Sequence, residues 1–107
     1  MAMKVTLTEH ARQDRLDRLS TILATVELGE IILKTPSETD KTAEMLLTST
    51  GIIIVKSFTT GKIITGFMAS PRKVKNMYKA AGFEKMPRQV KNTINKNMEK
   101  YSFLYKI

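Results

Sequence analysis

Three apolar stretches separated by very short turns dominate the middle of the chain and restrict its fold more than any other feature. They are residues 42–48, 51–58 and 62–68, joined at Ser49-Thr50-Gly51 and Thr59-Thr60-Gly61. The run Gly51-Ile52-Ile53-Ile54-Val55 has the length and β-branching of a buried strand. Strands with such tight connections must be antiparallel neighbours. The sequence therefore predicts an antiparallel meander.

The N-terminal part adds a helix and further strands. Residues 4–7 alternate between apolar and polar side chains and predict a short first strand. Thr8 is a suitable N-cap for a helix over residues 9–27, and Gly29 is a natural stop after it. Residues 30–34 predict another strand, and the polar stretch 35–40 predicts a loop. We therefore expect four or five strands.

Two helices are expected to follow the sheet. Ser70-Pro71 opens the first with a serine cap and a proline in the first turn, and Gly82 ends it. Pro87 begins the second, whose apolar residues recur at helical spacing: Val90, Ile94, Met98, Tyr101 and Leu104. The predicted fold class is α+β, an N-terminal helix packed on a four- to five-stranded, mainly antiparallel meander, followed by two basic C-terminal helices. We expect one domain over residues 1–107, with the helix and sheet in 1–70 and the basic helical extension in 71–107.

Composition excludes several classes of protein. No apolar run reaches the roughly 18 residues that a membrane span needs, and the first residues lack the pattern of a secretory signal. The chain has no cysteine, which excludes a disulfide framework, a thiolate zinc site and a cysteine nucleophile. We expect a cytoplasmic protein that binds no membrane and needs neither a metal nor a cofactor.

Charge is distributed unevenly along the chain. Residues 1–55 hold six basic residues and eight acids, whereas residues 56–107 hold twelve basic residues and only two acids, Glu84 and Glu99. The positive charge of residues 56–107 favours a polyanionic partner. We expect this partner to be nucleic acid, and RNA in particular. The alternatives are an ordinary solvated surface and an acidic protein partner. The predicted nucleic-acid-binding residues are Arg72, Lys73, Lys75, Lys79, Arg88, Lys91, Lys96 and Lys100.

His10 is the single histidine and the natural candidate for a general base or acid. It shares the first predicted helix with Arg15 and Arg18, so a proton acceptor and phosphate-holding cations lie on one helix. The alternative is that the arginines form ion pairs on a solvated helix with Glu9, Asp14 and Asp17. Ser57 and Thr65 flank the turn at residues 59–61, and we expect them near one another across a hairpin. For both, a plain role as strand residues is the alternative.

Several of these residues carry a family resemblance. The opening Thr8-Glu9-His10-Ala11-Arg12, with Arg18 along the helix and a closing strand that contains Thr65 and Phe67, resembles small domains of unknown function in the barnase–EndoU–colicin–RelE class of ribonuclease toxins. The resemblance covers about residues 5–70 and departs from the pattern at Asp14 and at Phe67, where that class has arginine and tyrosine. It implies metal-independent RNA cleavage with catalytic residues His10, Arg15, Arg18 and Thr65. His10 would be base or acid, Arg15 or Arg18 would stabilise charge on the phosphate, and Thr65 would orient it.

A non-catalytic function is the main alternative to this enzyme. A small inhibitor or adaptor of the phage or mobile-element type would use the same basic surface to bind a host nucleoprotein complex or an acidic protein. A homodimer is a further expectation, because the chain ends in an apolar segment: Tyr101, Phe103, Leu104, Tyr105 and Ile107. Core packing of a terminal helix explains the same residues equally well.

Overall fold

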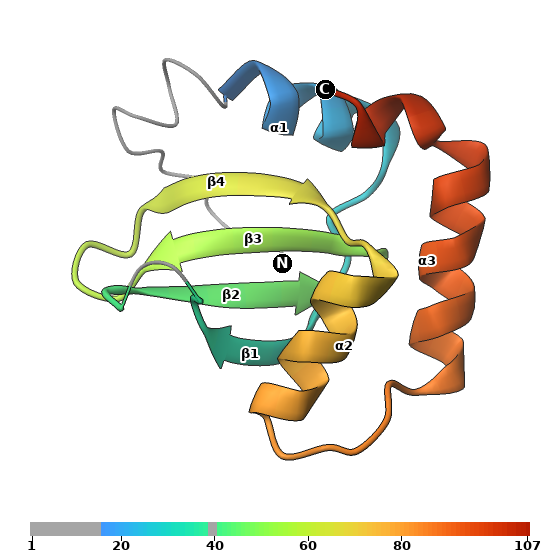
Figure 1. Cartoon of the computed structure of the whole chain (residues 1–107). Coiled ribbons are helices and arrows are strands. Elements are labelled where there is room, and N and C mark those ends of the chain that lie inside the picture. Colours follow the sequence, from blue (N-terminus) through green and yellow to red (C-terminus); the bar gives the residue numbers. More distant parts are fainter. Residues whose placement is uncertain (1–15, 39–40) are drawn as a thin grey trace.

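The computed structural model describes residues 16–38 and 41–107 and has an antiparallel sheet with helices on both sides (Figure 1). The predicted strand at 4–7, the Thr8 cap and residues 9–15 lie outside the described residues. In chain order the described elements are α1 (Leu16–Thr25), β1 (Ile31–Pro36), β2 (Ala43–Thr48), β3 (Ile52–Ser57), β4 (Ile63–Met68), α2 (Pro71–Ala80), α3 (Arg88–Lys100) and the 3-10 helix η2 (Ser102–Tyr105).

The sheet confirms the predicted meander. Its order is β1-β2-β3-β4, and each neighbouring pair is antiparallel. β1 continues to Pro36, so the prediction of a loop from residue 35 was wrong: Thr35 is opposite Met45 and Pro36 opposite Glu44. Proline is tolerated there because β1 is an edge strand and the missing amide leaves no ladder bond unmade.

The first helix ends earlier than predicted, at Thr25 rather than residue 27. The amide of Val26 still donates to the carbonyl of Ile22 at 2.8 Å. The following carbonyls of Glu27 and Leu28 instead lie within hydrogen-bond distance of the Thr50 hydroxyl, which belongs to the β2–β3 turn. A side chain distant in sequence therefore provides a donor for the segment that follows this helix, and the chain continues as irregular structure toward β1.

The second and third helices begin as predicted. The Ser70 hydroxyl accepts a hydrogen bond from the Lys73 amide at 3.3 Å, and Pro71 occupies the first turn of α2. α3 follows Pro87 but ends at Lys100, so the prediction of one continuous helix through Leu104 was wrong. Tyr101 leaves the helical conformation, with φ −119° and ψ 37°. The chain then tightens into η2, which keeps Leu104 buried.

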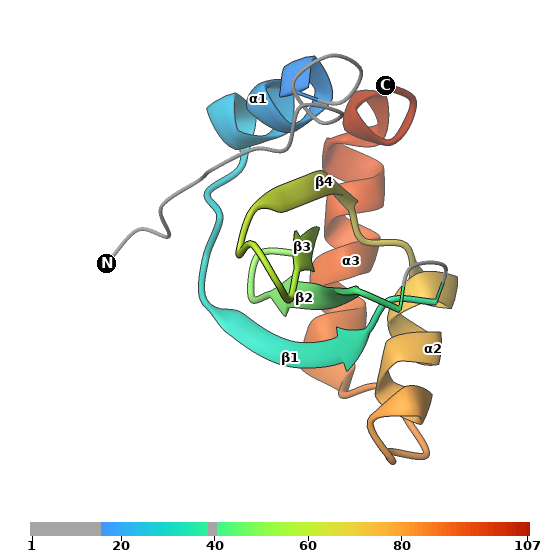
Figure 2. The ribbon, with the colours of Figure 1, turned by 90° about the vertical axis from the view of Figure 1, so that its left-hand side faces the viewer.

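The two faces of the sheet carry separate hydrophobic clusters. Ile53 and Val55 of β3 point to one face and pack with α2 and α3 residues, among them Val74 and Ile94. Ile54, on the opposite face, belongs to the other cluster, which is completed from α1 and η2 by Leu19, Ile22, Val26 and Leu104. Figure 2 shows the resulting arrangement, with α1 over the β4 edge of a curved sheet and α2 toward β1. The described C-terminal segment is thus part of the core.

Candidate nucleic-acid interface

The outward face of α2 is basic. Val74, Met77 and Tyr78 are buried against the sheet. Arg72, Lys75 and Lys79 are exposed on the other side, as their spacing along the helix requires. The helix contains no acid, so α2 presents an uninterrupted row of cations to solvent.

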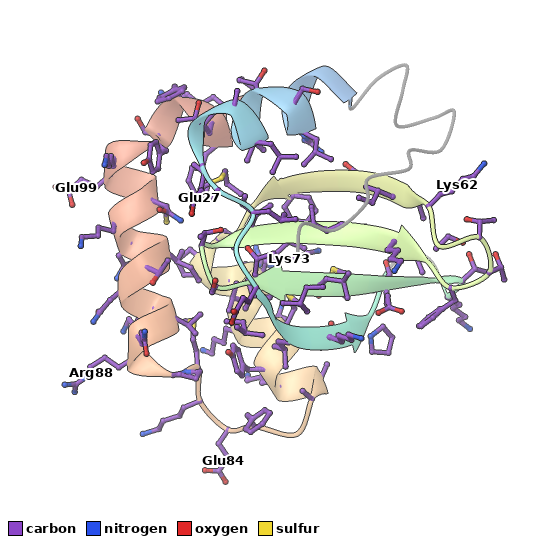
Figure 3. The ribbon with its side chains drawn as sticks, turned by 180° about the vertical axis from the view of Figure 1, so that it is seen from behind. Glu27, Lys62, Lys73, Glu84, Arg88 and Glu99 are labelled. Atoms are coloured by element: carbon purple, nitrogen blue, oxygen red, sulfur yellow. The ribbon has the colours of Figure 1, made fainter. Side chains whose placement is uncertain are left out.

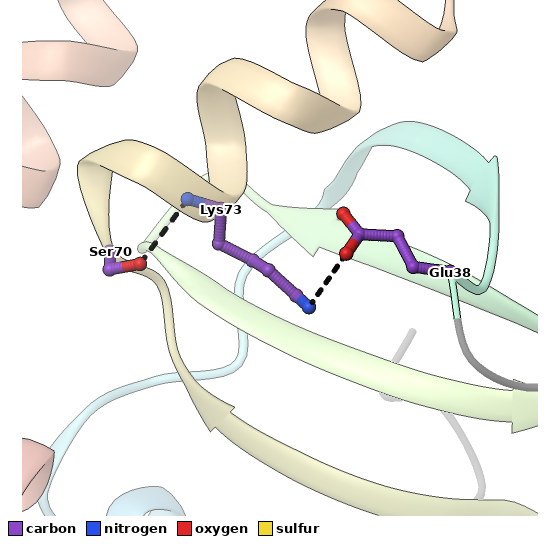
Figure 4. A network of polar contacts seen from close by, with 3 residues as sticks. All are labelled: Glu38, Ser70 and Lys73. Carbon is purple, nitrogen blue, oxygen red and sulfur yellow. Dashed lines mark hydrogen bonds and ion pairs between the residues drawn. The ribbon is translucent and has the colours of Figure 1, made fainter.

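Lys73, one of the predicted nucleic-acid-binding residues, departs from this pattern. Its ammonium is 3.5 Å from the Glu38 carboxylate, in the segment after β1, while its backbone amide is capped by Ser70 (Figure 4). The ammonium also lies 6.0 Å from the centroid of the Phe67 ring. Lys73 is therefore directed back over the sheet and pairs within the molecule.

α3 presents a mixed face of cations and amides. Arg88, Asn92, Asn95 and Glu99 are spaced by three or four residues and form one outward strip. Figure 3 shows Arg88 near one end of this helix and Glu99 near the other, far from Lys62 across the molecule. The exposed lysines Lys91, Lys96 and Lys100 flank the strip. An open hollow of about 770 Å³ runs along this surface, lined by Arg88, Gln89, Asn92, Thr93, Asn95, Lys96 and Glu99.

Two of the four predicted catalytic residues are in contact. The Arg18 guanidinium donates to the Thr65 hydroxyl at 3.0 Å, although the two residues are 47 positions apart. Arg18 also lies 6.0 Å from the Phe67 ring centroid. Because α1 lies over the β4 edge (Figure 2), its side chains reach both faces of that strand: Leu19 is beside Gly66 on one face, and Arg18 bonds Thr65 on the other. His10 and Arg15 lie outside the described residues.

Ser57 does not join this pair. Its hydroxyl is 3.1 Å from that of Thr59 and accepts from the Thr60 amide at 3.3 Å. These contacts close the β3–β4 turn, so Ser57 acts as a turn residue.

A cavity of about 150 Å³ beside the N-terminal half of α3 was not predicted from the sequence. It lies between the edge strand β1, the β2–β3 turn and the helix, and is lined by Ile32, Thr48, Ser49, Gly51, Gln89, Val90, Thr93 and Ile94. Gln89 and Thr93 also line the open hollow on α3, so the two spaces are bounded by the same two side chains. No sequence signal reveals this cavity, because its walls come from three separate segments.

Phe83 was also missed. Its side chain is 54% exposed in the loop after α2, with its ring 5.7 Å from that of Tyr78 in an edge-on arrangement. Lys79 precedes it by four residues, and Glu84 and Lys85 follow it directly. The position of an aromatic residue directly after Gly82, where the helix was predicted to end, could have indicated an exposed ring in a loop near lysines.

The apolar C-terminal segment is divided between core and surface. Leu104 is buried, and Tyr101 and Tyr105 are half-buried against the α1 cluster. Phe103 and Ile107 are exposed. Core packing therefore accounts for most of the segment that suggested a homodimer.

In the described part of the chain, no group of three or more histidine, cysteine or carboxylate side chains is placed to hold a metal ion. None of the helices described is long and apolar enough to cross a membrane. Comparisons of the chain with protein-family models, with curated proteins and with solved structures found no match.

Proposed function

We propose that this protein binds nucleic acid, with RNA favoured, along the exposed faces of α2 and α3. The observation that carries the proposal is the row Arg72, Lys75 and Lys79, exposed on a helix without an acid. Each contact between one of these cations and a phosphate releases counterions, which provides affinity that does not depend on sequence. The amides of Asn92 and Asn95 extend this surface with groups that hydrogen-bond sugar, phosphate or base edges.

Phe83 supports a single-stranded ligand. An exposed aromatic ring beside a positively charged surface is a stacking platform for unpaired bases, and such stacking contributes about 1–3 kcal/mol per base. Its edge-on contact with Tyr78 holds the ring in place. The α2–α3 loop therefore supplies a base contact between two phosphate-binding helices.

The test is RNA binding by matched charge reversals. The variant Lys75→Glu/Lys79→Glu is compared with Lys34→Glu/Lys62→Glu, which reverses two exposed lysines away from α2. Lys34 is opposite Leu46 on the sheet face that α2 does not cover, and Lys62 follows the β3–β4 turn. Both variants change the net charge equally. In fluorescence anisotropy with a labelled single-stranded RNA, we expect the α2 variant to lose about ten-fold or more in affinity and the control to lose much less. Equal losses would show that only net charge matters and that α2 is not the interface.

A second candidate function is metal-independent RNA cleavage, and the Arg18–Thr65 hydrogen bond favours it. In this hypothesis the ribose 2′-hydroxyl attacks the adjacent phosphate, its proton passes to a base, and the 5′-oxygen leaves with a proton from an acid. The product carries a 2′,3′-cyclic phosphate. His10 is the proton-transfer residue, Arg15 or Arg18 stabilises the charge on the phosphate, and Thr65 orients it.

Incubation of the full chain with labelled RNA in EDTA tests this second function. We expect cleavage that His10→Ala abolishes and that Thr65→Val reduces, with Thr65→Ser retaining most of the activity because it keeps the hydroxyl. Retention of intact RNA by all four proteins would reject catalysis and support the non-catalytic inhibitor or adaptor. Binding to a protein target in nuclease-treated extract then separates an adaptor from a nucleic-acid binder.

A further inference from the structure

The cavity beside α3 has walls of two kinds. Ile32, Val90 and Ile94 give it apolar surface, while Gln89, Thr93 and Ser49 place an amide and two hydroxyls at its rim. None of the residues that line it is ionisable. A charged group entering it would lose water without gaining an opposite charge, so the space suits a neutral ligand with a polar edge.

The size of the cavity limits that ligand further. A space of about 150 Å³ is close to that of an engineered protein cavity that binds benzene, and it is well below the range of about 300–1,000 Å³ usual for drug-sized ligands. It therefore holds one six-membered ring and excludes two fused rings.

The surface next to the cavity carries charged side chains, whereas the lining of the cavity carries none. The open hollow that Gln89 and Thr93 also line contains Arg88 and Lys96, with one carboxylate, Glu99, toward the other end of α3 from Arg88 (Figure 3). The side chains of Arg88 and Lys96 are exposed. A ligand seated with a neutral ring in the cavity thus directs the rest of its structure onto cations. A neutral single ring joined to an anionic tail is the chemistry of a pyrimidine nucleotide.

We infer that this cavity is a pyrimidine subsite: the base of one nucleotide enters between β1 and α3, and its phosphates lie along α3 at Arg88 and Lys96. The inference rests on the proposed function in naming the substrate class of the same surface. A nucleotide within an RNA strand and a free mononucleotide share this chemistry, and the test below separates them.

The key variant is Thr93→Leu, which extends a larger apolar side chain at the rim. The Thr93 hydroxyl donates to the Gln89 carbonyl of its own helix at 3.0 Å, and leucine has the higher helix propensity, so we expect α3 to persist. Thr25→Leu is the matched control, because the Thr25 hydroxyl makes the same bond to the Thr21 carbonyl on α1, at 3.3 Å. Gln89→Leu is a second test variant at an exposed position, where folding is not at stake.

Binding is measured for labelled oligouridylate, oligoadenylate and an abasic strand of equal length. We expect the native chain and Thr25→Leu to bind oligouridylate roughly five-fold or more tightly than the other two strands. This factor corresponds to about 1 kcal/mol, the lower end of the range for binding one base. Stacking on an open surface tolerates every base, and backbone flexibility alone can favour pyrimidine runs, so enclosure is indicated by the loss of the preference in the rim variants. Thr93→Leu and Gln89→Leu should lose the preference while retaining the affinity for the abasic strand.

Other outcomes discriminate between the two proposals. Equal binding of all three strands by the native chain, or a preference that survives both rim variants, overturns the pyrimidine subsite and leaves the proposed function standing. If no strand binds, the proposed function fails, and titration with uridine monophosphate decides the subsite. Binding of this nucleotide that Thr93→Leu abolishes supports a free mononucleotide as ligand; no binding overturns the subsite as well.

Discussion

Tyr105 fastens the C-terminal turn to the sheet through one side-chain hydrogen bond. Its hydroxyl donates to the carbonyl of Ala69 at 2.8 Å, just after β4. Burial raises the pKa of Tyr105 from 10.0 to about 12, because the phenolate would lose water in this position. The hydrogen bond also requires the proton, so ionisation removes the contact and introduces a poorly solvated charge.

This pKa predicts a pH window for stability. Since the folded-state pKa exceeds the unfolded value, the contribution of Tyr105 is fully present below pH 10 and is lost as the pH rises toward about 12. Tyr105→Phe should lower the free energy of unfolding by about 1 kcal/mol at neutral pH. In urea titrations, the difference between the two proteins should shrink above pH 10. Burial also raises the pKa of Tyr78, but that effect is common to both proteins and cancels. A constant difference at all pH values would contradict this account.

At this scale the sequence identified candidate groups but not their partners. Arg18 and Thr65 were both named, yet their contact depends on α1 lying over the β4 edge, which no local pattern encodes. Lys73 has the same charge and helix as Lys75, and only the position of Glu38 and Phe67 separates their roles. The residue type predicts which charge or hydrogen bond a side chain can offer, whereas tertiary contacts decide which partner it has.

At the scale of elements, the β2–β3 turn is connected to α3 by a single side chain. Asn97 is 8% exposed and its amide donates to the Thr50 carbonyl at 2.8 Å. Gly51, the next residue, has φ +88°, and a Cβ atom there would lie 2.5 Å from the Asn97 amide nitrogen. Glycine is required both by its backbone conformation and by the close approach of the helix.

Comparing two glycine substitutions separates these two effects. Gly61, in the β3–β4 turn, also has a positive φ of 70°, but a Cβ atom there meets only the Lys56 side chain, at 3.9 Å. Gly61→Ala should therefore cost only backbone strain, about 1–2 kcal/mol. Gly51→Ala should cost a further 1–3 kcal/mol or so, because it also disrupts the buried hydrogen bond of Asn97. Chemical denaturation measures both values; equal losses would show that the Asn97 contact contributes nothing.

The elements themselves were largely predictable, because strand patterns and turn residues are local signals. The meander, the Ser70 cap and the start of α3 all follow from neighbouring residues. The errors fall at element ends. After α1 ends at Thr25, the hydroxyl of Thr50 lies within hydrogen-bond distance of the carbonyls of Glu27 and Leu28. β1 extends through Pro36 because β2 is beside it. Both contacts are made with residues that lie further along the chain.

At the scale of the whole molecule, the fold determines how the charge asymmetry is presented. The sheet places α2 and α3 together, away from the β3–β4 turn (Figure 1). The sequence predicted the excess of charge in residues 56–107 but not that Lys73 would pair internally with Glu38. Nor did it predict the cavity, whose walls meet only in the folded chain.

The salt dependence of RNA binding tests whether this arrangement, rather than total charge, forms the interface. For a single strand, the slope of log K against log salt changes by about 0.7 for each phosphate contact. Replacing Arg72, Lys75 and Lys79 with glutamine should therefore reduce the magnitude of the slope by about 2 if each binds one phosphate. Glutamine at Lys34, Lys62 and Lys106, which are also exposed, removes the same charge. That control should lower affinity slightly and leave the slope nearly unchanged, because distant charges are screened within about 10 Å at moderate salt. Equal slopes for both triple variants would mean that the RNA lies elsewhere on the surface or has no fixed position.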